Sequence, residues 1–321
     1  MKHRKIFTSL AIIILITLIT LPACNTVEQV IASVPGGGGS GSVEEDSSLP
    51  DRDNTPIILE NVASGESTFG GEGAEVDYSH VNEGYVMIKY AGDNSKVKVQ
   101  ITKDGGEAYT YDLVPNQDFV AFPLSAGDGY YQVGVFLNID GQQYSTAASQ
   151  GFEAYIEDPF QPFLRANQFS NFNASSQAVA KAAELSAGAK TTLGAVEQMF
   201  MFIVNNIDYD YDLAATVQSG YIPNVDNTLA TQKGICFDYA ALMTAMLRSQ
   251  GIPCQLVVGY AGPAYHAWIS VYSSETGKVY KVIQFNGDQW TLMDPTFMAT
   301  GDTADPNIVG DGENHEAMFF Y

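Results

Sequence analysis

The sequence predicts two folded domains, an all-β domain over residues 56–157 and an α+β domain over residues 158–321. Residues of the first part alternate between apolar and polar with a period of two, as half-buried strands do. The second part begins with helix-like segments and continues with strand-like runs, an order typical of α+β folds rather than of repeated βαβ units. The chain has 321 residues, of which 45% are hydrophobic, and this is enough material for two separate cores.

The all-β domain is predicted from its strand and turn pattern. In "KVKVQITK" the apolar residues Val97, Val99 and Ile101 alternate with polar ones. Asp-Gly pairs at 104–105 and 140–141 separate strand-like runs, which is a strong hairpin signal. A succession of short strands of this kind favours an immunoglobulin-like or fibronectin-like sandwich. We find no catalytic group of residues in this domain, and it could serve as a spacer or as a binding platform.

The α+β domain begins after Pro159 and Pro162, which interrupt regular structure. Two helix-like segments follow, "SSQAVAKAAELSAG" and "TTLGAVEQMFMFIVNN", each opened by Ser or Thr as N-cap candidates. A third apolar segment, "YAALMTAMLRSQG", precedes the strand-like runs "CQLVVGY", "HAWISVY" and "KVYKVIQF".

The first 23 residues predict an export signal. Three basic residues near the start precede an apolar run over residues 6–21, which is the usual order of such a signal. A transmembrane anchor is the alternative, since the run approaches the length that spans a bilayer. The ending "LPAC" favours processing.

Leu21, Ala23 and Cys24 resemble the lipobox of bacterial lipoproteins. The resemblance implies that Cys24 is lipidated and that the protein is held by a lipid at the bacterial cell surface or on the periplasmic face. Residues 24–55 are rich in Gly, Ser, Pro and acidic residues, so they predict a flexible tether.

The formal net charge of −22, from 37 acidic and 15 basic residues, argues against nucleic acid as a partner, because a strongly anionic surface repels phosphates. A cationic or neutral substrate is easier to accommodate.

Cys236 in "GICFDY" is the first candidate for chemistry. It lies in the first turn of a predicted helix, where free N–H groups and the helix dipole stabilise a thiolate. A nucleophilic thiol also needs a base with an orienting acceptor, and His266 and Asp294 lie beside strand-like runs downstream. Each residue taken alone fits a structural role better: a buried cysteine, a core histidine and an aspartate in a turn.

The combination resembles the transglutaminase-like superfamily. The segments that carry the resemblance are "NNIDYDYD", "TLATQKGICFDYAALMTAMLRSQGIPCQLVVGY", "HAWISVY", "QWTLMDPTF" and "GDGENHEAMFFY", in the order of that family. The resemblance implies a papain-like fold in which the cysteine helix packs against an antiparallel sheet. It also implies that Cys236 is the nucleophile, His266 the general base and acid, and Asp294 the carboxylate that orients the imidazole.

The remaining candidates are weaker. Tyr260, Tyr265, Trp268 and Trp290 could line an aromatic cleft, although core packing is the simpler interpretation. Asp238 fits a helix-terminal role, and Cys254 is expected to be buried and unpaired, because the helix places it too far from Cys236 for a disulfide. The backbone N–H of Cys236 is a candidate oxyanion donor by analogy. No metal or cofactor is expected.

The resemblance implies a surface-anchored enzyme that acts on amide bonds through an acyl-thioester, either as a peptidase or deamidase or in protein-glutamine amine transfer. Its partners would be peptide or protein substrates, including cell-wall peptides or surface proteins, with the membrane reached through the lipid. The alternative is a catalytically inactive surface binding module that keeps both domains as a scaffold.

Overall fold

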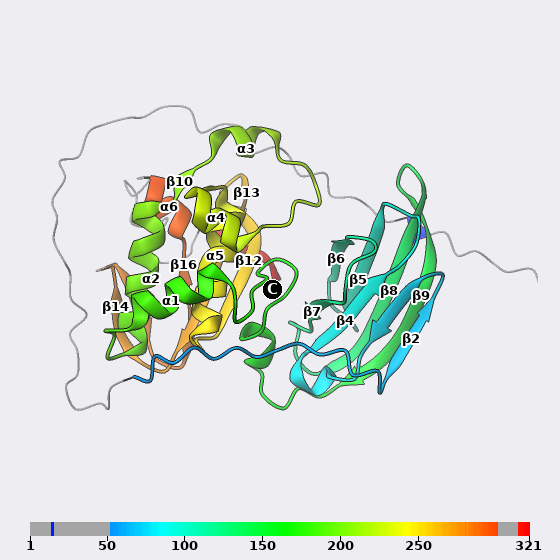
Figure 1. Ribbon diagram of the computed structural model, residues 1–321, viewed down its shortest axis with the longest axis horizontal. Coiled ribbons are helices and arrows are strands. Elements are labelled where there is room, and N and C mark those ends of the chain that lie inside the picture. Colours follow the sequence, from blue (N-terminus) through cyan, green and yellow to red (C-terminus); the bar gives the residue numbers. More distant parts are fainter. Residues whose placement is uncertain (1–13, 16–51, 281, 301–313) are drawn as a thin grey trace, which may run out of the picture. The chain divides into compact units, whose positions relative to one another are not determined.

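The computed structural model of the protein describes residues 14–15, 52–280, 282–300 and 314–321 (Figure 1). They form two compact units. Unit 1 contains residues 62–157 with the strand at 14–15, and unit 2 contains residues 52–61 and 158–321. Among these residues no helix combines the length and apolar character needed to cross a membrane. The predicted signal and Cys24, apart from residues 14–15, lie outside the described residues.

Unit 1 consists of two antiparallel sheets. One sheet has the strand order β1-β9-β8-β5-β6 and the other β2-β3-β4-β7. The elements are β1 (Ile14–Leu15), β2 (Thr68–Gly71), β3 (Ala74–Asp77), the 3₁₀ turn η1 (Val81–Glu83), β4 (Tyr85–Tyr90), β5 (Val97–Lys103), β6 (Ala108–Leu113), β7 (Val120–Pro123), β8 (Gly129–Asp140) and β9 (Gln143–Ala154).

Both predicted Asp-Gly hairpins are confirmed, as β5–β6 and β8–β9. The alternating residues Val97, Val99 and Ile101 are buried. Tyr111 of β6 meets Phe122 of β7 edge to face at 4.8 Å, so aromatic side chains join the two sheets. The β-rich character of this region was therefore predictable, and the finer immunoglobulin-like assignment stays a prediction.

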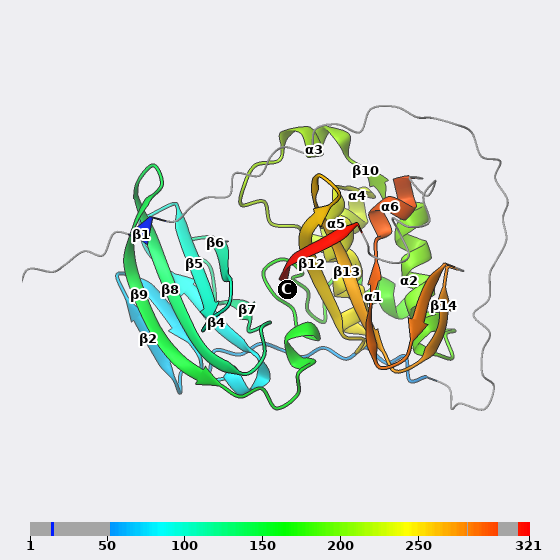
Figure 2. The same cartoon turned by 180° about the vertical axis from the view of Figure 1, so that it is seen from behind.

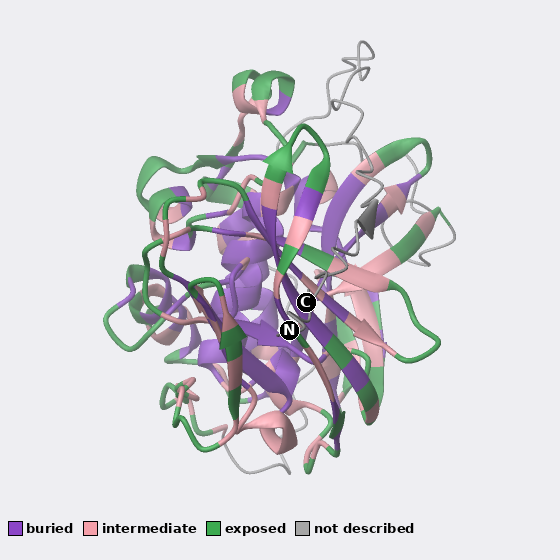
Figure 3. Cartoon of the chain, turned by 90° about the vertical axis from the view of Figure 1, so that its right-hand side faces the viewer, coloured by how far each residue is buried: buried purple, intermediate pink, exposed green. Residues whose placement is uncertain are grey.

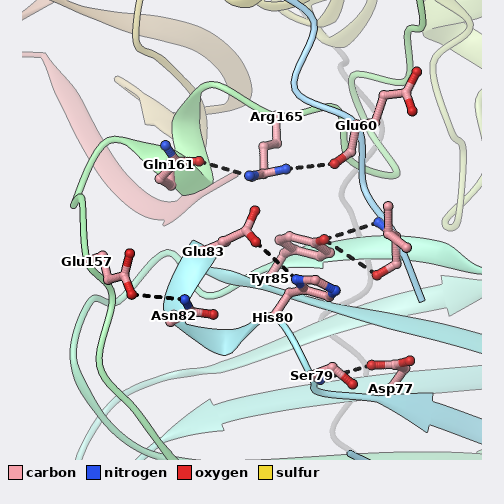
Figure 4. Close-up of polar contacts among 11 residues, drawn as sticks. Glu60, Asp77, Ser79, His80, Asn82, Glu83, Tyr85, Glu157, Gln161 and Arg165 are labelled. Atoms are coloured by element: carbon pink, nitrogen blue, oxygen red, sulfur yellow. Dashed lines mark hydrogen bonds and ion pairs between the residues drawn. The ribbon is translucent and has the colours of Figure 1, made fainter. Parts of the chain in front are cut away.

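Polar contacts close one end of unit 1. His80 Nδ1 contacts Glu83 Oε1 at 3.0 Å, and the His80 ring stacks on Tyr85 (Figure 4). Asp77 accepts the backbone N–H of Ser79 at 2.9 Å. These contacts stabilise a turn, so His80 has a structural role in unit 1.

Unit 2 places its helices on one face of a four-stranded antiparallel sheet with the order β16-β13-β12-β17 (Figures 1 and 2). Its elements are the 3₁₀ turn η2 (Gln161–Phe163), α1 (Gln177–Ser186), α2 (Thr192–Asn206), β10 (Asp208–Tyr209), α3 (Tyr211–Thr216), α4 (Val225–Thr231), β11 (Lys233–Gly234), α5 (Cys236–Ser249), β12 (Cys254–Ala261), β13 (Ala264–Ser273), β14 (Thr276–Val279), β15 (Ile283–Asn286), β16 (Gln289–Met293), α6 (Pro295–Thr300) and β17 (His315–Phe320).

Helix α5 is the centre of unit 2. It packs on β12 and β13 on one side and on α1, α2 and α4 on the other, and all but one of its 14 residues are buried (Figure 3). A helix that is apolar all round is expected to be a core helix. Its position explains why "YAALMTAMLRSQG" shows no polar face.

Arg248 is a charged residue within this mainly apolar helix, and it has no exposed surface. Its guanidinium donates to the carbonyl oxygens of Cys254 (2.9 and 2.7 Å), Arg165 (2.7 Å) and Tyr321 (2.6 Å). Burial lowers its pKa to about 10, against the electrostatic effect of Cys254. One side chain thus ties the end of α5 to β12, to the chain after η2 and to the residue after β17.

The predicted helix starts are partly confirmed. Thr191 caps α2 by accepting the N–H of Gly194 at 3.0 Å. Ser176 precedes α1 but makes no side-chain cap bond to it, since its hydroxyl accepts the N–H of Asn173 instead.

The run "KVYKVIQF" is not one strand. It forms the β14–β15 hairpin, because Tyr280 takes a left-handed backbone conformation with φ of 50° and turns the chain. A period-two pattern continues through a tight turn, so the pattern alone did not show the reversal.

Residues 52–61 are bonded to unit 2, although the all-β domain was expected to begin at residue 56. The N–H of Ile57 donates to Ser249 O at 2.8 Å, and Arg165 Nη1 donates to Glu60 O at 2.8 Å (Figure 4). These hydrogen bonds to backbone oxygens do not depend on a periodic pattern of apolar residues, so the sequence did not reveal them.

We expect Arg248→Met to lower the free energy of unfolding of unit 2 by about 3 kcal/mol, because three buried carbonyl oxygens lose a charged donor. Both tryptophans of the chain lie in unit 2, so urea titration followed by tryptophan fluorescence reports on this unit. Lys181→Met, which removes a surface pair with Glu184, is the control and should change the value by less than about 0.5 kcal/mol. Equal effects of the two variants would contradict the role given to Arg248.

Candidate active site

Cys236 is the first residue of α5, and the chain around it explains why the helix begins there. Ile235 is extended (φ −94°, ψ 177°), and its N–H donates to Asp238 Oδ2 at 2.9 Å. The N–H of Asp238 donates in return to Ile235 O at 2.9 Å, as in a capping box. Asp238 therefore has the expected helix-terminal role. Cys236 is thus in the first turn of α5, where the backbone N–H groups have no partners within the helix.

Tyr221 fixes Asp238 from a loop. Its hydroxyl donates to Asp238 Oδ1 at 2.7 Å. Burial raises the pKa of Asp238, while the bonds from Ile235 and Tyr221 lower it in part. The cap of the cysteine helix is thus a buried carboxylate with both oxygens occupied.

His266 and Asp294 come together from neighbouring strands. His266 lies in β13, and Asp294 follows β16, which pairs with β13 through Ile269 and Met293. The distance from His266 Nε2 to Asp294 Oδ2 is 2.6 Å. Because Asp294 binds Nε2, the other ring nitrogen, Nδ1, is left for Cys236, whose electrostatic interaction with His266 helps to raise the pKa of the imidazole.

The Asp294 carboxylate is completely buried. Its Oδ1 accepts the N–H groups of Thr296 (3.0 Å) and Phe297 (3.1 Å) at the start of α6. Burial opposes its charge, but His266 and the surrounding donors outweigh burial and hold the pKa of Asp294 well below its usual range. The carboxylate is fixed in place and stays ionised.

The His266 ring is nearly buried, at 6% exposure. Burial by itself lowers the pKa of an imidazole, but the charge of Asp294, the interaction with Cys236 and the hydrogen bonds to both raise the pKa of His266 well above 6.5. The site therefore favours an imidazolium between two acceptors, which is the arrangement in which a neighbouring thiolate is stabilised.

His315 also binds Asp294, and the sequence analysis did not select it. Its Nε2 lies 3.3 Å from Asp294 Oδ2, and its side chain is 1% exposed. The signal was present, because His315 precedes an aromatic strand-like run just as His266 does in "HAWISVY". The spacing along the chain gave no reason to bring the two histidines together.

The four aromatic candidates have different surroundings. Trp268 is 2% exposed and its ring lies 6.2 Å from that of His266. Tyr265 contacts Tyr260 edge to face at 5.5 Å and interacts electrostatically with Cys236. Trp290 instead packs in an aromatic cluster, with Phe163 at 5.4 Å and Tyr272 at 5.7 Å, as the packing interpretation expects.

Cys254 is a free, fully buried thiol. It contacts Thr244 Oγ1 at 3.5 Å, and burial raises its pKa to about 11. The structure agrees with the expected unpaired role.

His266, Asp294 and His315 offer three ligand atoms within 4.8 Å of one another, which is a donor set that a divalent metal accepts. No metal was expected from the sequence. In the described part of the chain these residues are held by direct hydrogen bonds, as set out above.

We expect iodoacetamide to label Cys236 rapidly near pH 6 and to leave native Cys254 unlabelled. The raised pKa of His266 keeps the imidazolium in place above pH 6.5, and His266→Ala removes it. Labelling of Cys236 near pH 6 should be slower in that variant, because the neighbouring cation is lost. Peptide mass spectrometry from pH 5 to 9 distinguishes the two thiols; identical profiles of wild type and variant would contradict the pairing.

One family model matches the part of the chain that holds the site. Residues 179–295 match the model of the transglutaminase-like superfamily. A UPF0252 protein of Methanocaldococcus jannaschii is 31% identical over 125 residues, which are 35% of this chain and 34% of that protein. The match thus spans about a third of the relative's length.

Solved structures of similar proteins are more distant. A Cytophaga hutchinsonii protein proposed to be a cysteine protease has a TM-score of 0.36 at 16% identity, over 67% of this chain and 68% of that one. Red sea bream transglutaminase has a TM-score of 0.29 at 14% identity, over 66% and 48%. A Parabacteroides distasonis protein proposed to be a protease has a TM-score of 0.26 at 13% identity, over 62% and 60%.

The matched segment contains Cys236, His266 and Asp294 and all the helices from α2 to α5. Residues 179–295 of this chain are therefore a transglutaminase-like domain.

Proposed function

We propose that the protein is a cysteine enzyme that acts on amide bonds through an acyl-thioester intermediate. The observation that supports this most directly is the linked set Cys236, His266 and Asp294. The thiol lies at a helix N-terminus, the imidazole interacts with it electrostatically, and a buried carboxylate 2.6 Å from Nε2 holds the ring. These are the parts that nucleophilic catalysis by cysteine requires.

In the proposed reaction the Cys236 sulfur attacks the amide carbonyl and forms the carbon–sulfur bond. The proton held at His266 Nδ1 passes to the departing nitrogen, and the carbon–nitrogen bond breaks. Water or an amine then attacks the thioester, gives its proton to His266 and releases Cys236. Asp294 keeps the ring in the required orientation through both steps.

The class of acceptor decides the product. With water the enzyme is a peptidase or deamidase, and with a lysine-like amine it joins a glutamine-like donor to that amine. We favour hydrolysis, because the resemblance to the transglutaminase-like superfamily implies protease-like as well as transferase-like activity. The acidic composition, −22 in total, suits cationic peptides or amines by electrostatic attraction.

We propose further that Cys24 is lipidated and that the predicted tether, shortened at its end because residues from Arg52 onward bond to unit 2, holds the domains at the cell surface. The support is the signal-like first 23 residues and the ending "LPAC". Cell-wall peptides and neighbouring surface proteins are the substrates within reach of such a tether. The two sheets of unit 1, as an immunoglobulin-like sandwich, would serve as spacer or binding platform.

The second candidate is a surface binding module without turnover. One observation favours this candidate: the proposed reaction uses none of the described residues of unit 1. In that case Cys236 is dispensable.

We expect Cys236→Ala to abolish turnover with the fold retained, a loss of at least about 10³-fold, because the nucleophile cannot be replaced by water alone. Ammonia release from glutamine peptides, cleavage of a peptide library and incorporation of a fluorescent amine into casein would be measured in parallel. Circular dichroism checks the fold.

The matched control is Cys254→Ala, which removes the buried thiol and should keep most of the activity. Hydrolysis products alone would assign a peptidase or deamidase, and amine incorporation would assign a transferase. Equal activity of Cys236→Ala and wild type would favour the binding module.

We expect Cys24→Ser to prevent incorporation of an alkyne-labelled fatty acid when the full chain is expressed in a bacterium, because serine offers no thiol for the lipid. The protein should then shift from the membrane fraction to the soluble fraction. Asn25→Ser, at the adjacent position, is the control and should label normally. Labelling of the Cys24→Ser variant would contradict the proposed anchor.

A further inference from the structure

His315 is a buried titratable group that the proposed reaction does not use. Its Nε2 points at Asp294 Oδ2, the same oxygen that binds His266. The two histidine rings approach to 6.3 Å between their centres. Asp294 Oδ1 is already occupied by two backbone N–H groups, so the second histidine is not needed to fix the carboxylate.

The fold places His315 through a tight pairing of β12 and β17. His315 lies opposite Ala261, and the register of the two strands shifts between Val258 and Gly259. A Cβ atom on Gly259 would lie 2.0 Å from Glu316 O, so only glycine allows β17 to approach this closely. The shift determines which β17 residue faces Asp294.

Aromatic rings enclose the His315 side chain. Trp268 meets it edge to face at 4.8 Å and Phe297 at 5.9 Å. Its Nδ1 is buried and has no hydrogen-bond partner among the described residues. A ring that carries its hydrogen at Nε2 presents only a lone pair at Nδ1, whereas hydrogen at Nδ1 would leave a buried donor unpaired and Nε2 unable to donate to Asp294.

We propose that His315 is a positioning residue that donates its Nε2–H to Asp294 and so shares the carboxylate with His266. A carboxylate oxygen with two donors offers less negative charge to each of them. His315 thereby weakens the stabilisation that Asp294 gives to the imidazolium form of His266. This matters for acyl transfer because His266 must release its Nδ1 proton to the leaving nitrogen, and an acid or base matched to its task transfers protons most efficiently.

Two groups act directly on His266: Asp294, between β16 and α6, and Cys236, at the start of α5, and both raise its pKa. His315, at the start of β17, acts on Asp294. Removal of the His315 donor leaves Asp294 with one histidine partner, so the pKa of His266 should rise further and its loss of the proton should move to higher pH.

A metal centre is the alternative for these three residues. A metal bound at about 2.1 Å to each of two ligands in tetrahedral geometry separates them by about 3.4 Å. The His266–Asp294 distance of 2.6 Å is too short for this, and among the described residues His315 Nδ1 has no outer partner of the kind that metal-bound histidines normally have. The geometry favours direct hydrogen bonds.

The test is ¹⁵N NMR of the histidine rings in the full chain, which contains four histidines that are assigned by single substitutions. The wild type should show His315 with hydrogen at Nε2. In His315→Phe, which keeps the ring contacts but has no donor, the titration midpoint of His266 should rise by about half a pH unit or more. In His315→Gln, whose amide reaches the same position, the midpoint should stay near that of the wild type.

Hydrogen at Nδ1 of His315, an unchanged midpoint in His315→Phe, or equal shifts in both variants would each overturn the proposal. If one equivalent of Zn²⁺ shifts both ring signals of the wild type, and EDTA reverses the shift, the cluster is a metal site and the proposal is also wrong. Tryptophan fluorescence confirms that each variant is folded.

The role of His315 in catalysis rests on the proposed function, but the NMR titration of the histidine rings does not require a substrate. Failure of every amide assay with the expected NMR result would therefore reject the enzyme and keep the shared carboxylate. Active enzyme with an unchanged His266 midpoint in His315→Phe would do the reverse.

Discussion

The burial of α5 is the constraint on which the rest of unit 2 depends. A helix enclosed on all sides must satisfy the free polar groups at both of its ends inside the protein. Asp238 accepts the N–H of Ile235 at the first turn, and at the last turn the carbonyl oxygen of Ser249 accepts the N–H of Ile57. The Arg248 side chain also bonds this end of α5 to β12 and to the residue after β17. These bonds hold the first residue, Cys236, at a fixed point against the sheet.

The second organising element is the Asp294 carboxylate, a charge with no exposed surface. Such a charge persists only where donors replace its water, and here two backbone N–H groups and two histidines do so. The same donors that make burial tolerable also set the ring of His266. Stability and chemistry therefore depend on one group, which is common where pKa values are strongly shifted.

Short sequence patterns predicted those features of the fold that depend on residues close together in the chain. The Asp-Gly turns, the cap at Thr191, the apolar α5 and the unpaired Cys254 follow from neighbours in the chain. The family resemblance led to Cys236, His266 and Asp294, which the structure brings together. The hairpin at Tyr280 was missed because alternation continues across it. His315 was missed because its position depends on a register shift at Gly259. The packing partners of Trp290 were not predictable either, because they include Phe163, which is far away in sequence.

The separation of the two described thiols has a consequence for redox chemistry. Cys254 is bonded through its carbonyl to Arg248 near the end of α5, about 18 Å along the helix from Cys236. An oxidant that converts Cys236 to a sulfenic acid therefore finds no resolving thiol beside it within the described chain. Without an internal disulfide as a protected state, recovery depends on a small-molecule thiol or a reductase from outside, and further oxidation is irreversible. The Cys236 thiol, the proposed nucleophile, thus depends on reductant from its surroundings to recover from oxidation.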